Sequence, residues 1–234
     1  RLGASQIKLM AGGGVSSLYD QLEDVQYFED ELHAAVMAAE DAGTYVMVHV
    51  YVPEAIRRAI RAGVKSIEHG QLIDEPTMKL IAEKGVWLSM QPFIGEGNNH
   101  YTNPVQQAKH ELVVQGTDRA YQLAKKYGVK LAWGTDLLFS PANARNQNLN
   151  IEKMTRWFSN FEILKMITHD NAELLALSGR RNPYPGKLGV IEEGALADLI
   201  VVDGNALEDI KVLTDPGKNM LLIMKDGKIY KNDL

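Results

Sequence analysis

The chain has 234 residues, of which 45% are apolar and 24% are charged, and its formal net charge is -5. This length and composition are typical of a soluble protein with one large domain, or with a domain and a small appendage. No basic face indicates nucleic-acid binding, no apolar run is long enough to span a membrane, and the absence of cysteine excludes disulfides and thiolate metal ligands. We expect any export signal to lie upstream of Arg1, so cytoplasmic and exported locations both stay open.

Short apolar segments alternate with amphipathic segments along most of the chain. Each predicted strand is nearly all apolar, which is typical of a parallel sheet with helices outside it. The predicted strands span residues 6–10, 45–49, 66–69, 86–90 and 130–133. The predicted helices span residues 29–42, 53–62, 75–84, a long segment between the polar loop 92–104 and residue 127, and residues 150–157, 160–168 and 171–177.

Side chains with metal-binding chemistry follow the ends of these strands. His49 and His69 end two neighbouring strands, and Asp136 follows another. An isolated histidine in an apolar segment is more often a core residue, and Gly-Thr-Asp is more often an ordinary turn. Two histidines at the same end of adjacent parallel strands lie within reach of one ion, however, and imidazole is a preferred ligand of zinc-like metals. In a (β/α)₈ barrel this end of the strands carries the active site.

Lys8 is unusual because it lies inside a strand that is predicted to be buried. A buried ammonium group is costly, so such a lysine tends to lose its proton. The neutral amine can react with carbon dioxide to form a carbamate, which has the shape and charge of a carboxylate and can bridge two cations. The glycines of segment 11–14 permit close approach of a ligand, although a flexible loop explains them equally well.

The last part of the chain is predicted to be a small β-rich element after a linker at residues 182–186. Asp226-Gly227 predicts a two-residue hairpin turn between residues 220–225 and 228–230. About 50 residues of this kind hold little core by themselves. We therefore divide the chain into residues 1–181 and 182–234.

Four motifs, in this order and spacing, resemble the amidohydrolase superfamily. The resemblance is strongest to its binuclear-metal branch, which includes imidazolonepropionase-related enzymes and prolidase-like Xaa-Pro/Xaa-Arg dipeptidases. It implies an α/β fold, a (β/α)₈ TIM-type barrel of which this chain contains strands four to eight, with part of a C-terminal β-sandwich that includes Gly194 to Leu199. The four motifs are Ile7-Lys8-Leu9-Met10, Val48-His49-Val50-Tyr51, Ile67-Glu68-His69-Gly70 and Gly134-Thr135-Asp136.

The resemblance implies a role for each matched residue. Lys8 matches a carbamylated lysine that bridges two metal ions, zinc in the first place, and His49 and His69 match the ligands of the second ion. Asp136 matches the aspartate that contacts the first ion and handles the proton of the attacking water. The implied reaction is hydrolysis of a small amide or dipeptide substrate, and a homo-oligomer is plausible for this family.

Three further residues are candidate substrate contacts because they lie at the same end of the predicted strands. Tyr51 is two residues beyond His49, and Gln91 and His100 lie in the loop after residues 86–90. A structural role is equally plausible for Tyr51 and more common for the other two.

One departure from the family pattern is the absence of its His-x-His metal pair, since no two of the six histidines are spaced i, i+2. The strand count indicates that strands one to three are missing. We expect the natural chain to continue upstream, or another polypeptide to supply the missing half of the barrel. The alternatives are an incomplete, non-catalytic α/β fragment or binding module, and a single-metal barrel of the deaminase type, against which Lys8 argues. Metal content discriminates between them.

Overall fold

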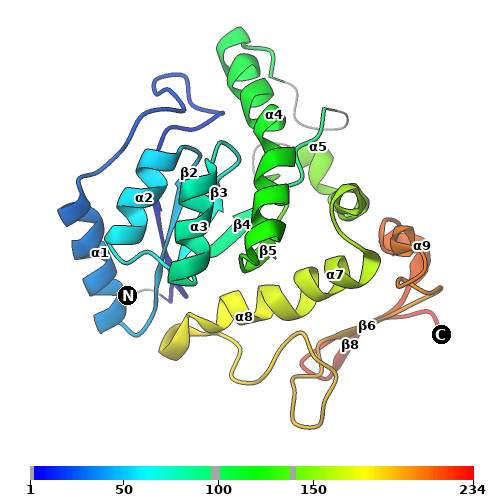
Figure 1. Cartoon of the computed structure of the whole chain (residues 1–234). Helices are drawn as coiled ribbons and strands as arrows, with labels where there is room; N and C mark the ends of the chain where they lie inside the picture. The colour runs from blue at the N-terminus through cyan, green and yellow to red at the C-terminus, as the bar shows by residue number, and fades with distance from the viewer. Residues whose placement is uncertain (1–2, 96–100, 138–140) are drawn as a thin grey trace. The chain divides into compact units, whose positions relative to one another are not determined.

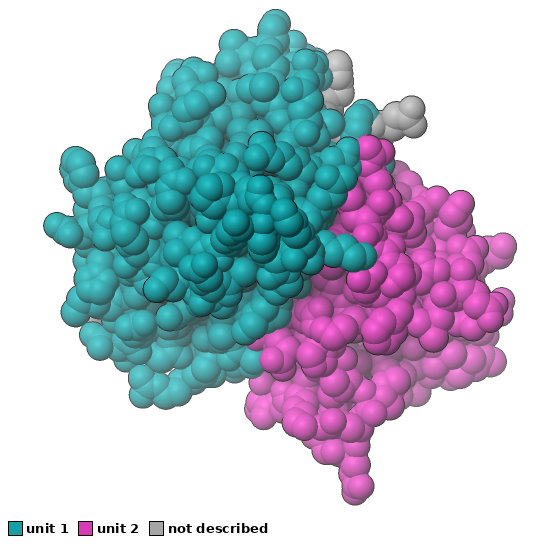
Figure 2. Space-filling model, in the orientation of Figure 1, with its two compact units in different colours: residues 1–132, 175–183 teal, residues 133–174, 184–234 magenta. Residues whose placement is uncertain are grey.

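The structure, a computed structural model, describes residues 3–95, 101–137 and 141–234. It consists of two compact units (Figure 2), one formed by Arg1–Ala132 with Leu175–Pro183 and the other by Trp133–Leu174 with Tyr184–Leu234. The division into domains at residues 1–181 and 182–234 stays a prediction.

The first unit is built on a parallel sheet whose strands follow one another in chain order, β1-β2-β3-β4-β5 (Figure 1). Neighbouring strands are joined by helices, which is the connectivity of a segment of a β/α barrel. The α/β prediction is confirmed, and all five predicted strands are present to within one residue at either end. The strands span Ile7–Met10 (β1), Val46–Val50 (β2), Ser66–His69 (β3), Trp87–Met90 (β4) and Leu131–Trp133 (β5).

Four helices accompany these strands, and each packs against the next. Their ends follow from local sequence signals. The Asp74 and Asn103 side chains accept hydrogen bonds from backbone amides of the first turns of α3 and α4, and Gly85 and Gly128 end those helices in the left-handed conformation. The helices span Glu29–Asp41 (α1), Pro53–Arg61 (α2), Glu75–Lys84 (α3) and Pro104–Tyr127 (α4).

The two faces of the sheet differ in chemistry. Residues in register share a face, and side chains alternate along each strand. One face carries fully buried Val48, Ile67 and Leu88, which form the core with the helices. The other face carries polar and charged groups in register, so the side chains of interest for function gather on it; they include Lys8, His49 and Glu68.

Lys8 is exposed, contrary to the expectation of a buried strand. The reason is that β1 is an edge strand: within the described residues it pairs only with β2. The edge position gives β1 little cover, so the expected burial of Lys8 is not observed within the described residues.

The second unit contains short helices and an antiparallel sheet. Helices α6, α7 and α8 confirm the three predicted helices, although 3₁₀ and π turns, Met154–Arg156 and Met166–Asp170, end the first two. The Asp226-Gly227 hairpin is confirmed, with φ of 50° and 71° at its two turn residues. The elements are Pro141–Ala144 (α5), Leu149–Lys153 (α6), Asn160–Lys165 (α7), Asn171–Ala176 (α8), Leu199–Val202 (β6), Pro216–Asn219 (α9), Met220–Lys225 (β7) and Lys228–Asn232 (β8).

Over the described ranges, no helix combines the length and the apolar character needed to cross a membrane.

Candidate metal and catalytic site

The structure brings His49 and His69 together at the carboxyl ends of β2 and β3. Their ring centroids are 4.5 Å apart, with an angle of 72° between the ring planes. Both side chains are buried, with 7% and 3% of their surface exposed. Two imidazoles that are this close together and this well shielded from water can both serve as ligands of one metal ion.

The backbone at His69 is what makes this pair possible. His49 is in register with Glu68, and His69 with Val50, so a regular strand would direct the two imidazoles to opposite faces of the sheet. His69 instead has a φ of 79°, in the left-handed region. Such a conformation costs on the order of 1–3 kcal/mol in a non-glycine residue and is concentrated at functional sites. It ends the regular alternation of β3 and is consistent with the approach of the His69 ring to His49.

Each histidine uses one ring nitrogen in a hydrogen bond and leaves the other available. His49 Nε2 lies 3.0 Å from the carbonyl oxygen of Gly13, and His69 Nδ1 lies 2.7 Å from Gln91 Oε1. Both oxygens are acceptors, so these nitrogens carry the protons and donate. His49 Nδ1 and His69 Nε2 then present lone pairs, and neither has a hydrogen-bond partner within the part of the chain that the structure describes. Fixing the second nitrogen in this way is typical of metal-binding histidines.

The electrostatic surroundings keep both rings neutral. Burial is the main cause that lowers the pKa of His69, to about 3, and the charges of His49 and Lys8 act in the same direction. Burial also lowers the pKa of His49, again with a contribution from Lys8. The Lys8 charge therefore acts on both imidazoles, although its side chain is exposed. A neutral imidazole is the form that binds a metal ion.

Two of the three candidate substrate contacts adjoin the histidine pair. The Tyr51 ring lies 5.1 Å from the ring of each histidine, and Gln91 accepts the hydrogen bond from His69. Both side chains are buried, and their role as substrate contacts stays a prediction. His100 lies outside the described residues.

Gln71 is a member of this cluster that the sequence analysis missed. It is 1% exposed, and its Nε2 lies 3.5 Å from Gln91 Oε1. Gln91 therefore accepts from an amide and an imidazole at the same oxygen, which fixes the orientation of its own amide. The available signal was the position of Gln71, two residues after His69 in the loop that follows β3.

Replacing Gln91 with leucine is expected to weaken zinc binding by about 10- to 100-fold, because His69 loses the acceptor that holds its Nδ1–H. The affinity is measured by competition with a chromophoric chelator. Gln122→Leu, at an exposed position of α4, is the matched control and should leave the affinity unchanged. An unchanged affinity in Gln91→Leu would show that the His69 tautomer does not depend on this amide.

Asp136 follows β5 and belongs to the second unit. It too has a left-handed backbone, with a φ of 49°. Within the same unit, the Asn171 side chain fixes Trp133, the last residue of β5, three residues before Asp136. It accepts a hydrogen bond from Trp133 N at 2.9 Å and donates one to Trp133 O at 3.0 Å. Asn171 was not among the residues expected to contribute to the site.

The two histidines do not form a complete ligand set by themselves. Across residues 3–95, 101–137 and 141–234, no group of three or more histidine, aspartate or glutamate side chains is placed to hold an ion. The structure thus shows a pair of imidazole donors, and further ligands stay a prediction.

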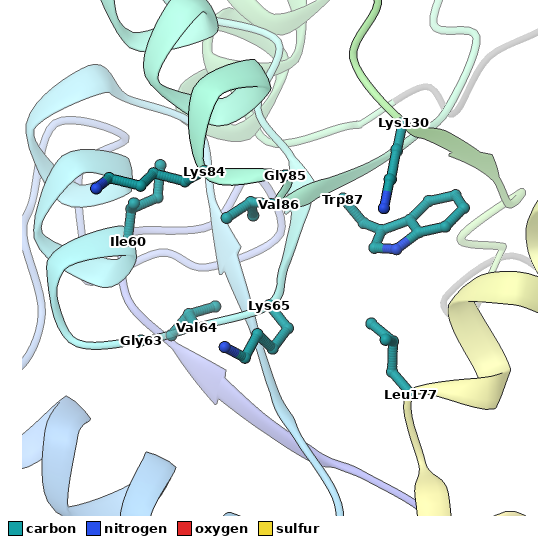
Figure 3. A pocket seen from close by; sticks show the side chains of 10 residues that line it. All are labelled: Ile60, Gly63, Val64, Lys65, Lys84, Gly85, Val86, Trp87, Lys130 and Leu177. Carbon is teal, nitrogen blue, oxygen red and sulfur yellow. The ribbon is translucent and has the colours of Figure 1, made fainter.

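A cavity of about 210 Å³ lies at the opposite, amino-terminal ends of the strands. Its lining includes Lys65, which precedes β3, Trp87 at the start of β4, and Lys130, which precedes β5. Figure 3 shows the Lys130 ammonium group beside the Trp87 ring, 5.7 Å from the ring centroid, and away from the ammonium groups of Lys65 and Lys84. In barrels this face of the strands serves stability, and active sites lie at the opposite face.

Three comparisons relate the chain to known proteins. The profile of the Amidohydrolase family matches residues 1–230. Ochratoxinase from Aspergillus niger is 34% identical over 235 residues, which cover 99% of this chain and 47% of that enzyme. The chain thus spans about half the length of the curated relatives it matches first.

Solved structures give the same result. A prolidase complexed with N-methylphosphonate-L-proline has 37% identity and a TM-score of 0.87, with 98% of this chain and 55% of the prolidase covered. A Xaa-Pro dipeptidase with bound methionine in the active site has 32% identity and a TM-score of 0.84, with 98% and 55% covered.

Proposed function

Because this chain belongs to the amidohydrolase family, we propose that it forms part of a metal-dependent hydrolase that cleaves a carbon–nitrogen bond in a small amide or dipeptide. The predicted family resemblance is confirmed, and so is the fold, which corresponds to part of the barrel of these proteins. The observation that carries the proposal is the pair of neutral, buried histidines in which Gly13 and Gln91 each hold one ring nitrogen, so that His49 Nδ1 and His69 Nε2 stay free.

The donor set of this pair fits a zinc-like divalent ion. The site offers two imidazole rings with centroids 4.5 Å apart, and in each ring one nitrogen is fixed by a hydrogen bond. Lys8 acts electrostatically on both rings, and we propose that its carbamate completes the site as a bridging ligand. A divalent metal held there would lower the pKa of a bound water and polarise the scissile carbonyl group.

The proton transfers are assigned to Asp136. As a carboxylate it accepts a proton from the attacking water, and it then delivers this proton to the leaving nitrogen. Tyr51 and Gln91 shape the wall of the site beside the histidines. A prolidase and a Xaa-Pro dipeptidase among the similar structures make Xaa-Pro dipeptides the first substrates to test. A homo-oligomer and a complementary half of the barrel are further parts of this proposal.

The alternative is a non-catalytic α/β module that binds a partner or a small ligand. It draws on the absence of a His-x-His pair from the sequence and on the coverage of only about half of the relatives' length. Such a module has no need of metal, whereas a catalytic relative holds up to two ions in each complete barrel.

The test is metal analysis of the native protein, together with its intact mass and hydrolysis of a panel of Xaa-Pro dipeptides. Bound zinc-like metal with hydrolysis supports the hydrolase. A protein that takes up no metal and cleaves no member of the panel would favour the binding module.

Lys8→Ala is expected to abolish the binding of a second metal ion, because the bridging group is lost. The metal-to-protein ratio is measured by elemental analysis after gel filtration. Lys65→Ala, which removes another exposed lysine of the same unit, is the control and should keep the wild-type ratio. An unchanged ratio in Lys8→Ala would rule out the carbamate bridge.

A further inference from the structure

A buried lysine holds the glycine-rich loop beside the histidine pair. Lys109 lies on α4, and its side chain is only 5% exposed. Its ammonium group donates to the carbonyl oxygens of Gly14 at 3.2 Å and Ser17 at 2.9 Å, and also to that of Asp20. The Asp20 carboxylate lies 3.5 Å away and supplies the opposite charge. We call residues 11–20 the glycine loop.

The glycine loop is also fixed from within. An added Cβ at Gly13 would lie 1.8 Å from the carbonyl oxygen of Gln21, so no larger residue fits there. The Asp20 carboxylate accepts a hydrogen bond from the Gly14 amide at 3.3 Å. Val15 is buried in an apolar cluster with Val113 of α4. The loop therefore has one conformation that its own packing and Lys109 jointly support.

This conformation places a carbonyl group on His49. The carbonyl oxygen of Gly13, one residue before the Gly14 carbonyl that Lys109 binds, accepts the hydrogen bond from His49 Nε2 at 3.0 Å. A path of two hydrogen bonds and one peptide unit thus joins Lys109 to His49. The two residues are 60 positions apart in the sequence and touch the same turn of the loop.

Stability alone is a weak reason to bury this ammonium group. An apolar side chain of similar volume usually stabilises a buried position at least as well as an ion pair does. The apolar cluster of Val15 and Val113 includes one residue of the glycine loop and one of α4, the helix that carries Lys109. An apolar residue, however, cannot bind three carbonyl groups at once. It therefore cannot orient the neighbouring peptide groups of the glycine loop.

We propose that Lys109 is a positioning residue that acts through the glycine loop: it holds the Gly13 carbonyl against His49 Nε2 and so keeps His49 Nδ1 as the metal donor. This inference rests on the proposed function for the role of Nδ1, and on the contacts above for the rest.

The test uses Lys109→Met in the native protein, with Lys126→Met on the same helix as the control. Lys126 forms an exposed ion pair with Glu75, far along α4 from the loop. The first readout is the tautomer of His49, read from ¹⁵N shifts of selectively labelled, metal-free protein at one fixed pH. The second is chymotryptic cleavage after Tyr19, whose side chain is 97% exposed in the loop.

In Lys109→Met we expect mixed His49 tautomers in place of the single Nε2–H form, cleavage at Tyr19 faster by about tenfold, and zinc affinity lower by about 10- to 100-fold. Lys126→Met should match the wild type in all three measurements. Asp20→Asn removes the charge partner of Lys109 but leaves the carbonyl groups, so its three values should lie between those of Lys109→Met and Lys126→Met. Asp20→Asn replaces Lys109→Met if Lys109→Met does not fold.

Faster cleavage with an unchanged His49 tautomer would overturn the proposal, because Lys109 would then support the loop without positioning the histidine. An unchanged cleavage rate together with an unchanged tautomer would also overturn it. A change of tautomer in a protein whose wild type binds no zinc would leave the positioning role intact and refute the proposed function instead.

Discussion

His69→Asn and His49→Asn are each expected to lower kcat/KM for a Xaa-Pro dipeptide by about 10³-fold, which corresponds to about 4 kcal/mol of transition-state stabilisation. Each variant removes one of the two imidazole donors of the buried pair. The amount of bound metal should therefore fall together with kcat/KM. Asparagine is suited to position 69 because it tolerates the left-handed backbone that His69 adopts with its φ of 79°. Steady-state kinetics and elemental analysis on the same samples give both results.

His33→Asn is the control for this experiment. His33 is an exposed histidine of α1 whose Nδ1 lies 3.2 Å from the carbonyl oxygen of Ala62, so it has the same side chain as the pair but lies outside the site. Wild-type kinetics are expected for it. If His69→Asn and His49→Asn kept both activity and metal, the histidine pair would be a packing feature of the core.

Asp136→Asn is expected to lower kcat by about 10²- to 10⁴-fold while the KM and the metal bound by the histidines change little, because the amide cannot accept a proton from the attacking water. The left-handed backbone at this position, with a φ of 49°, is again one that asparagine adopts readily. Steady-state kinetics over a range of pH should also show the loss of the limb that reports ionisation of the general base.

Asp226→Asn is a closely matched control because Asp226 is also an aspartate with a left-handed backbone, with a φ of 50°, in the hairpin turn between β7 and β8. The same chemical change at the same backbone conformation should leave kcat unaltered there. A kcat for Asp136→Asn within a few-fold of the wild type would assign the proton transfer to another group.

The strands and the positions that end them could be predicted because the signals are local. Each strand is a short apolar run, and glycines such as Gly85 and Gly128 mark the ends of the helices before β4 and β5. Once the strands are parallel neighbours, their carboxyl ends meet, so the topology brings positions 49 and 69 to the same end of the sheet. The approach of the two rings also depends on the left-handed backbone of His69.

The parts that sequence did not predict depend on long-range contacts. Lys109 reads as one more charge on a long helix, and its buried contacts are with residues 89 to 95 positions away. The sequence His69-Gly70 at the end of a strand gives no sign that the backbone of His69 is left-handed. Lys8 was expected to be buried, but within the described residues β1 pairs only with β2 and Lys8 is exposed.

The two histidines differ in the kind of group that holds their spare nitrogen. His49 donates to a backbone carbonyl, and His69 to a side-chain amide. No larger residue fits at Gly13, and its partner group for His49 is a backbone carbonyl, so no side-chain exchange there changes the electronic character of the His49 partner. Gln91, by contrast, becomes a carboxylate by one conservative exchange, which would make His69 a stronger electron donor. A substitution at Gln91, at the end of β4, can therefore change the Lewis acidity of a metal ion bound at such a site, whereas a substitution in the glycine loop cannot.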